Sequence, residues 1–143
     1  MIIWLLLHYK LPSKPSALRV YIWRKLKRLG AILLHEAVWV LPDNPRTAEQ
    51  VQWLAAEIQE MGGNAYYWRA NTILGEQEES ILQQFNKQVD EVYSDLLKRI
   101  EKPRADLQEI SKRFQQAASQ DFFKSKLGNL VRERLTTKRG EKP

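Results

Sequence analysis

The first 75 residues alternate short apolar runs with segments of helical periodicity, and this order is the strongest constraint on the fold. Residues 2–9 are apolar on both faces, as expected of a strand inside a sheet. Residues 15–29 carry apolar side chains at helical spacing and stop at Gly30, which predicts an amphipathic helix with a C-terminal glycine. Residues 31–41 predict two strands with a tight join at 35–37, or one sharply bent strand.

A second helix and a last strand complete this region. Asn44 is placed to cap a helix with Pro45 in its first turn, and Gly62-Gly63 ends that helix. Residues 64–74 are rich in strand-forming side chains. The order strand, helix, strand, strand, helix, strand predicts an α+β fold with a ferredoxin-like β-α-β-β-α-β unit over residues 1–75. Both helices cover one face of such a sheet, so something else must cover the other.

The remaining sequence is helical. Its apolar side chains predict a C-terminal helical hairpin hinged at Lys102-Pro103, followed by a short last helix over 123–135. The first helix of the hairpin is expected to bury Leu82, Phe85, Val89, Val92 and Leu96. We expect residues 76–136 to form a helical extension packed on the first unit, and residues 137–143 to form a frayed tail.

Composition excludes several classes of protein. The chain has no cysteine, which rules out disulfides, thiolate zinc sites and cysteine nucleophiles. Its apolar start, residues 1–8, lacks the basic region of a signal peptide, and no run approaches the roughly 18 apolar residues of a membrane span. We therefore expect a soluble, cytoplasmic protein with no membrane partner.

The charge pattern points to polyanions. Twenty-three basic and seventeen acidic residues give a net charge of +6, divided into two basic segments on either side of an acidic helix. On the first helix, Arg24, Lys27 and Arg28 lie on adjacent turns, with Arg19 one turn earlier and Trp23 among them. This surface suits phosphates or a small oxyanion, although a solvated helix face has the same composition. Near the C-terminus, Arg132 and Arg134 allow the same two readings.

Four aromatic residues on predicted strands, Trp4, Trp39, Tyr66 and Trp68, have two interpretations. They could stack unpaired bases, as in single-strand RNA readers, but the consensus of those readers is missing. Core packing is therefore favoured.

No pattern supports an enzyme. His35-Glu36 begins like a zinc-protease helix motif, but position 39 is Trp where a second His is required. Phosphate-loop and G-x-S-x-G signatures do not occur, and the carboxylate pairs fall on exposed helix positions. The sequence predicts no catalytic residue, metal site or cofactor.

The segments RVYIWRKLKRLGAILLHEAVWVLPDNPRT and QVQWLAAEIQEMGG resemble the N-terminal domain of the chromate-resistance regulator ChrB family. The resemblance covers nearly the whole chain. It implies a cytoplasmic bacterial regulator of a chromate efflux operon that binds DNA and responds to chromate, and it strengthens Arg24, Lys27 and Arg28 as DNA or anion contacts. Longer members carry a second, C-terminal domain, which we expect this chain to lack.

The element order is also similar to the ferredoxin-like CRISPR adaptation subunit and to the middle domain of phenylacetate-pathway repressors. The nuclease members hold a metal ion with an aspartate at the end of the first strand, where this chain has His8-Tyr9-Lys10. A small metal-dependent nuclease is thus disfavoured. Dimerisation through the sheet is common in that group and would cover the open face.

Two main hypotheses follow. The first is a DNA-binding regulatory module, expected to be a homodimer, that uses residues 19–28 aided by the C-terminal basic segment. The second is a protein-interaction or scaffold module without DNA affinity, whose helical hairpin and sheet bind a protein such as a separate C-terminal half. The stripe from Leu82 to Leu96 motivates this hypothesis.

Overall fold

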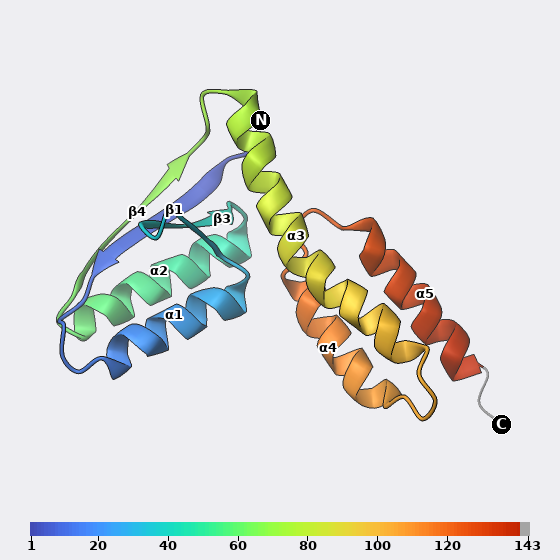
Figure 1. Cartoon of the computed structure of the whole chain (residues 1–143). Helices are drawn as coiled ribbons and strands as arrows, with labels where there is room; N and C mark the ends of the chain where they lie inside the picture. The colour runs from blue at the N-terminus through green and yellow to red at the C-terminus, as the bar shows by residue number, and fades with distance from the viewer. Residues whose placement is uncertain (141–143) are drawn as a thin grey trace. The chain divides into compact units, whose positions relative to one another are not determined.

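The chain forms two compact units in a computed structural model that describes residues 1–140. Unit 1 spans Met1–Glu78 and unit 2 spans Glu79–Pro143, and each is described by itself. Figure 1 follows the order β1 (Trp4–Lys10), α1 (Ala17–Leu29), β2 (Ile32–Leu34), β3 (Val38–Pro42), α2 (Pro45–Glu60), β4 (Asn64–Ala70), α3 (Gly75–Ile100), α4 (Leu107–Ser119) and α5 (Lys126–Gly140).

Unit 1 is built on a four-stranded antiparallel sheet with the strand order β2-β3-β1-β4. α1 and α2 lie side by side on one face of this sheet (Figure 1). This element order and strand order confirm the predicted α+β, ferredoxin-like unit followed by helices. β1 lies in the interior of the sheet between β3 and β4, as its apolar run predicted, whereas β4 is an edge strand.

The core of unit 1 lies between the sheet and the two helices. Leu5, Leu7 and Tyr9 share one face of β1, and clefts beside this face are lined by residues of α1 and α2. The helices add buried aliphatic side chains from their inner faces: Ile22 and Leu26 from α1, and Val51, Leu54 and Ile58 from α2. Each fully buried aliphatic side chain contributes about 1.5–3 kcal/mol, which fixes both helices on the sheet.

The join between β2 and β3 is a tight hairpin turn, so the two-strand interpretation is confirmed. His35 and Glu36 have φ of 50° and 58°, and the Ala37 N–H donates to the Leu34 carbonyl at 2.9 Å. Two consecutive left-handed residues make a type I′ turn, whose twist matches the flanking strands. Neither residue is Gly or Asn, the usual choices for this conformation.

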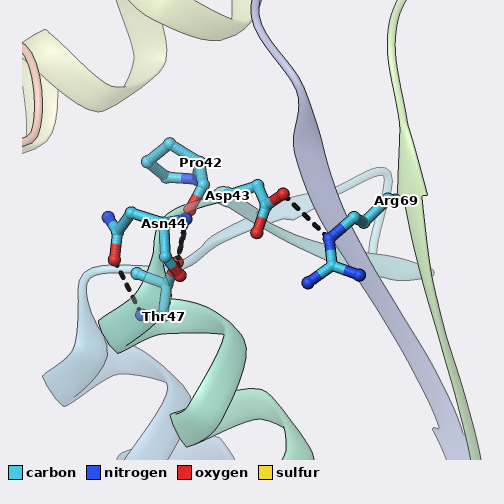
Figure 2. A network of polar contacts seen from close by, with 5 residues as sticks. All are labelled: Pro42, Asp43, Asn44, Thr47 and Arg69. Carbon is cyan, nitrogen blue, oxygen red and sulfur yellow. Dashed lines mark hydrogen bonds and ion pairs between the residues drawn. The ribbon is translucent and has the colours of Figure 1, made fainter.

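A capping box begins α2, as Figure 2 shows. The Thr47 N–H donates to Asn44 Oδ1 at 2.9 Å, and the Asn44 N–H donates to Thr47 Oγ1 at 3.0 Å. The buried Thr47 hydroxyl also donates to the Pro42 carbonyl at 2.6 Å, which fixes the end of β3 to the first turn of α2. The predicted Asn44 cap is therefore confirmed. Beside it, Arg69 Nε lies 2.9 Å from Asp43 Oδ2 and links β4 to this connection.

β4 ends at Ala70, four residues before the predicted end at Leu74. Ala70 pairs with Trp4, the first residue of β1, so β1 offers no further residue for β4 to pair with. Ile73 and Leu74 are consequently exposed, in spite of their strand-forming composition.

Unit 2 contains the predicted helical hairpin and the last helix. α3 ends at Ile100 and α4 begins at Leu107, so the turn falls at the predicted Lys102-Pro103 hinge. The predicted stripe of α3 is partly wrong, because Leu82 and Val92 are only half buried. The fully buried stripe is Ile81, Phe85, Val89, Tyr93, Leu96 and Ile100.

Tyr93 explains the shift in this stripe. Its hydroxyl donates to Asp121 Oδ2 at 2.9 Å, so its polar atom is satisfied and the ring is buried. It joins a core cluster in which side chains of α3 meet Ile110, Phe114 and Ala117 of α4 and Val131 and Leu135 of α5.

The end of the chain also differs from expectation. α5 continues to Gly140, whereas fraying was predicted from residue 137; residues 141–143 lie outside the described part. The predicted packing of the helical extension on unit 1 stays a prediction. Over residues 1–140, no helix is both long and apolar enough to cross a membrane.

Candidate anion-binding surface on the first helix

The predicted basic side chains of α1 all reach the surface. Ile22 and Leu26 are fully buried and fix the rotation of the helix about its axis. The other faces of the helix are therefore exposed to solvent. The exposed residues form two rows with a spacing of four: Arg19, Trp23 and Lys27 in one, and Arg24 and Arg28 in the other. At 3.6 residues per turn, Arg19 and Arg28 lie on opposite sides of the helix, whereas Arg24, Lys27 and Arg28 share one side.

Two of the four cations lie at the C-terminus of α1, whereas Arg19 lies in its first turn. Gly30 adopts φ 90° and closes the helix, with Lys27 and Arg28 in the last turn. The negative end of the helix dipole stabilises cations there and offers carbonyl groups instead of N–H donors. An anion beside Lys27 and Arg28 would therefore be held by side chains alone.

Arg19 and Arg24 differ from Lys25 in their partners. The side chains of Arg19 and Arg24 form no hydrogen bond or ion pair within residues 1–140. Lys25, in contrast, lies 2.7 Å from Glu57 of α2. The hydrogen bond to Glu57 raises the pKa of Lys25, and the same bond lowers the pKa of Glu57. Lys25 is thus a structural cation, and the exposed rows are the part of α1 that can meet a ligand.

A surface cleft of about 570 Å³ lies beside the first row. The end of β1, α1 and the β2–β3 hairpin surround it, and its lining includes Arg19, Trp23, Lys10, Tyr9 and Trp39. Burial raises the pKa of Tyr9, partly offset by a hydrogen bond with Trp39, so Tyr9 keeps its proton at neutral pH. The cleft therefore combines two cations and a neutral phenol with aromatic rings.

Glu36 at the hairpin turn also lines this cleft and opposes binding of an anion. Counting formal charges, two cations and one carboxylate leave the cleft with one net positive charge. Sequence reasoning found Arg19 and Trp23 but not Lys10, Tyr9 or Trp39. The predicted fold could have identified these cleft residues. In a ferredoxin-like sheet, the end of β1 and the join at 35–37 meet at the same end of the sheet.

The other two predicted site residues, Arg132 and Arg134, lie on α5 and belong to unit 2. The Arg132 guanidinium lies 5.5 Å from the centroid of the Phe114 ring and reaches Asn129 Oδ1 at 3.4 Å. Arg134 is engaged by Glu101 through two nitrogens, Nε at 2.8 Å and Nη2 at 2.6 Å. Arg132 therefore has no carboxylate partner in these contacts, whereas the charge of Arg134 is largely neutralised by Glu101.

The aromatic residues of the strands divide into two pairs. Trp4 and Trp39 are 1% and 4% exposed, which confirms the preference for core packing. Tyr66 and Trp68 are 56% and 52% exposed, so for them that preference is wrong. Both lie on the edge strand β4.

The two histidines lie in different environments. His8 Nε2 accepts a hydrogen bond from Trp68 Nε1 at 2.8 Å, and His35 is exposed in the hairpin turn. The part of the chain that the structure describes contains no cluster of three or more His, Cys, Asp or Glu side chains that could hold a metal ion.

Comparison with known proteins gives one family and one curated relative. The family model described as "Protein ChrB, N-terminal" matches residues 19–122, which include the whole of α1 after its first two residues. Protein ChrB of Cupriavidus metallidurans is 35% identical over 63 residues. That match spans 44% of this chain but only 19% of the relative's length. No solved structure matches.

Proposed function

The chain belongs to the family of ChrB N-terminal domains, and from this membership we propose that it is a DNA-binding regulatory module associated with chromate resistance. The observation that carries the proposal is the exposed double row of cations on α1. Arg19, Arg24, Lys27 and Arg28 all lie within the segment that matches the family. Arg24, Lys27 and Arg28 lie on one side of the helix within about one and a half turns, which suits neighbouring phosphate oxygens; such contacts position a protein on DNA.

The charge state of these side chains supports phosphate contacts. Arg19 and Arg24 have no partner side chain among residues 1–140, so no intramolecular ion pair must break before a phosphate binds. Arginine presents a planar fork that matches two phosphate oxygens at once. The net charge of +6 adds a general attraction toward DNA.

A titration of the chain against its own upstream DNA, by mobility shift at several salt concentrations, tests this proposal. Replacing Arg24 and Arg28 together by Ala should weaken binding and reduce the slope of log K against log salt by about 1.8, since each phosphate contact contributes about 0.9. The matched control replaces Lys112 and Arg113 by Ala, because these exposed α4 residues carry the same charge. Equal effects of the two double variants would reject α1 as the contact.

The proposal includes three further statements about the module. A regulator of bacterial DNA acts in the cytoplasm, where we place this chain. We propose that it binds as a homodimer, which sedimentation with and without DNA measures. Chromate as an effector is tested by equilibrium dialysis of the chain with chromate, with sulfate as the control oxyanion.

The scaffold alternative keeps the sheet as a binding surface but loses the helical stripe that motivated it. Its exposed stripe on α3 is used inside unit 2: Phe85 makes edge contacts with Phe122 and Phe123, and Val89 and Leu96 are buried in the core cluster. The nuclease alternative likewise lacks an aspartate at the end of β1, where His8 bonds to Trp68.

A further inference from the structure

Three side chains form an exposed aromatic array on the sheet face opposite α1 and α2. His8 of β1 lies directly across from Tyr66 of β4, and Trp68 is the next residue of β4 on the same face. The three ring centroids lie 5.8–6.3 Å apart, and every pair of planes is within 26° of parallel. Tyr66 and Trp68 each keep more than half of their surface in solvent.

His8 and Trp68 lie edge to edge in a single plane. Trp68 Nε1 donates to His8 Nε2 at 2.8 Å, and the two ring planes differ by 9°. An indole N–H and an imidazole lone pair both lie in the planes of their rings, so a short bond between near-parallel rings requires them to be coplanar. The bond also places the imidazole proton on Nδ1. The two side chains therefore form one flat plate, which we call the His8–Trp68 plate.

The chemistry of this plate limits what can bind it. The one donor of Trp68 and the Nε2 acceptor of His8 satisfy each other, so the bond leaves the flat faces as the main binding surface. Tyr66 adds a third ring nearly parallel to the plate. Exposed parallel rings of this kind bind flat unsaturated rings by stacking, without preference for hydrogen-bonding pattern.

The surrounding charge favours a nucleic acid as the source of those rings. On this face, β1 presents Trp4, Leu6, His8 and Lys10, and β4 presents Asn64, Tyr66, Trp68 and Ala70. No carboxylate occurs among these eight residues, and Lys10 is two positions from His8 along the same face. Residues 1–75 carry nine basic and five acidic side chains, a balance of +4.

We propose that the His8–Trp68 plate, extended by Tyr66, is a stacking surface for unpaired bases of single-stranded DNA, with Lys10 beside the phosphate backbone. Bases in a duplex are stacked on one another and present only their edges, so the plate selects unpaired strands. This site differs from the proposed duplex contact on α1 in its aromatic rings and in the form of DNA it binds, and it shares only Lys10 with the cleft beside α1.

The test measures binding of a fluorescently labelled oligothymidine to the full chain by anisotropy. Trp68→Ala and Tyr66→Ala should each raise Kd about fivefold to a hundredfold, the range seen when one stacked ring is lost. Trp68→Phe keeps a ring but loses the bond to His8, so it should give a smaller loss. Trp53→Ala is the matched control, because Trp53 is 63% exposed on α2 and lies outside the plate; it should leave Kd unchanged.

Each outcome decides the proposal. Circular dichroism confirms that the variants are folded, and His8→Ala provides a variant on the other strand should Trp68→Ala unfold. The proposal is overturned if oligothymidine does not bind, or if the plate variants bind it as tightly as Trp53→Ala does. It is also overturned if the plate variants change the sedimentation coefficient of the free protein, because the plate would then be a contact between two copies. Duplex binding by the same variants, which depends on Arg24 and Arg28, separates this result from the fate of the proposed function.

Discussion

Lys25 Nζ lies 2.7 Å from Glu57 Oε1, and this ion pair joins α1 to α2. Tyr21 completes the contact: its hydroxyl donates to Glu57 Oε2 at 2.6 Å, and its ring centroid lies 4.8 Å from the Lys25 ammonium. One carboxylate thus holds two side chains of the neighbouring helix. Because Lys25 is turned toward α2, the surface of α1 keeps its two rows of exposed cations.

Glu57→Gln should lower the free energy of unfolding by less than about 1 kcal/mol at neutral pH, because the pair is partly exposed. The Glu57 pKa is lowered from 4.5 in the folded state, so its stabilisation is present above about pH 4.5 and is lost in more acidic solution. The Lys25 pKa is raised from 10.5, so its stabilisation is present below about pH 10.5 and is lost as the pH rises further.

Urea unfolding of both proteins across this pH range measures the effect. The difference between wild type and Glu57→Gln should be largest near neutral pH and should shrink at both extremes. Glu60→Gln, an exposed change on the same helix, is the control and should stay close to wild type throughout. A pH-independent difference would show that the Glu57 charge contributes nothing.

Gly63→Ala should destabilise unit 1. A Cβ at this position would lie 2.4 Å from the Lys10 carbonyl oxygen and 3.0 Å from Ile58 Cγ2, so backbone must move to admit a methyl group. Overpacking of this kind costs about 1–3 kcal/mol, measured as a fall in the urea midpoint. Gly75→Ala is the matched control: nothing lies within 4 Å of its Cβ, and alanine favours the first turn of α3. Similar midpoints for both variants would contradict the close approach of Gly63 to β1.

Local signals explain why most of unit 1 could be predicted from sequence. Gly30 ends α1 at a left-handed φ, and Asn44 caps α2 through its own side chain. Each of these two helix ends depends only on residues within one or two turns, so each can be predicted from the local sequence. The order of elements was sufficient to predict the ferredoxin-like arrangement. Connections between secondary-structure elements rarely cross one another, so few topologies are possible for this order.

Contacts between distant segments explain what could not be predicted. The end of β4 depends on where β1 begins, and the bond from Trp68 to His8 joins residues 60 positions apart. The candidate surface shows the same limit: periodicity identified Arg24 and Arg28, whereas the capture of Lys25 by Glu57 joins residues 32 positions apart. Such pairings are set by the packed fold and leave no periodic trace in the chain.

Tyr93 should be the last tyrosine of the folded protein to ionise. Burial raises its pKa well above the ordinary value of 10.0, and the hydrogen bond to the Asp121 carboxylate raises it further. The folded state therefore loses stability above about pH 10, where an unfolded tyrosine ionises and a folded one does not. A titration followed by phenolate absorbance should show one group that ionises only as the protein unfolds.

Tyr93→Phe identifies that group. The variant should lack the late step and lose about 1 kcal/mol at neutral pH, since one hydrogen bond to a carboxylate is removed. Asp121 keeps its bonds from the Ser125 N–H at 3.0 and 3.1 Å, which limits the cost. If the late step persists in Tyr93→Phe, another tyrosine must carry it.

The two arginines of α5 should differ in their effect on duplex DNA binding. Arg132 lies exposed over the Phe114 ring and can turn to a phosphate, so Arg132→Ala should reduce the salt slope by about 0.9. Arg134→Ala should change the slope less, because Glu101 already holds that guanidinium through two nitrogens.

Glu101→Gln tests the reason for this difference. Glu101 Oε2 also lies 3.8 Å from Lys138 Nζ, so neutralising the carboxylate removes one ion pair from each of two cations. The variant should bind duplex DNA more tightly and with a steeper salt slope, and Arg134→Ala in that background should then cost as much as Arg132→Ala. Slopes are measured by mobility shift at four or more salt concentrations. Glu91→Gln on α3 is the control for loss of one negative charge, because Glu91 is exposed and forms no ion pair within residues 1–140. Equal slopes for Glu101→Gln and Glu91→Gln would mean that total charge, and not release of Arg134, governs binding by this helix.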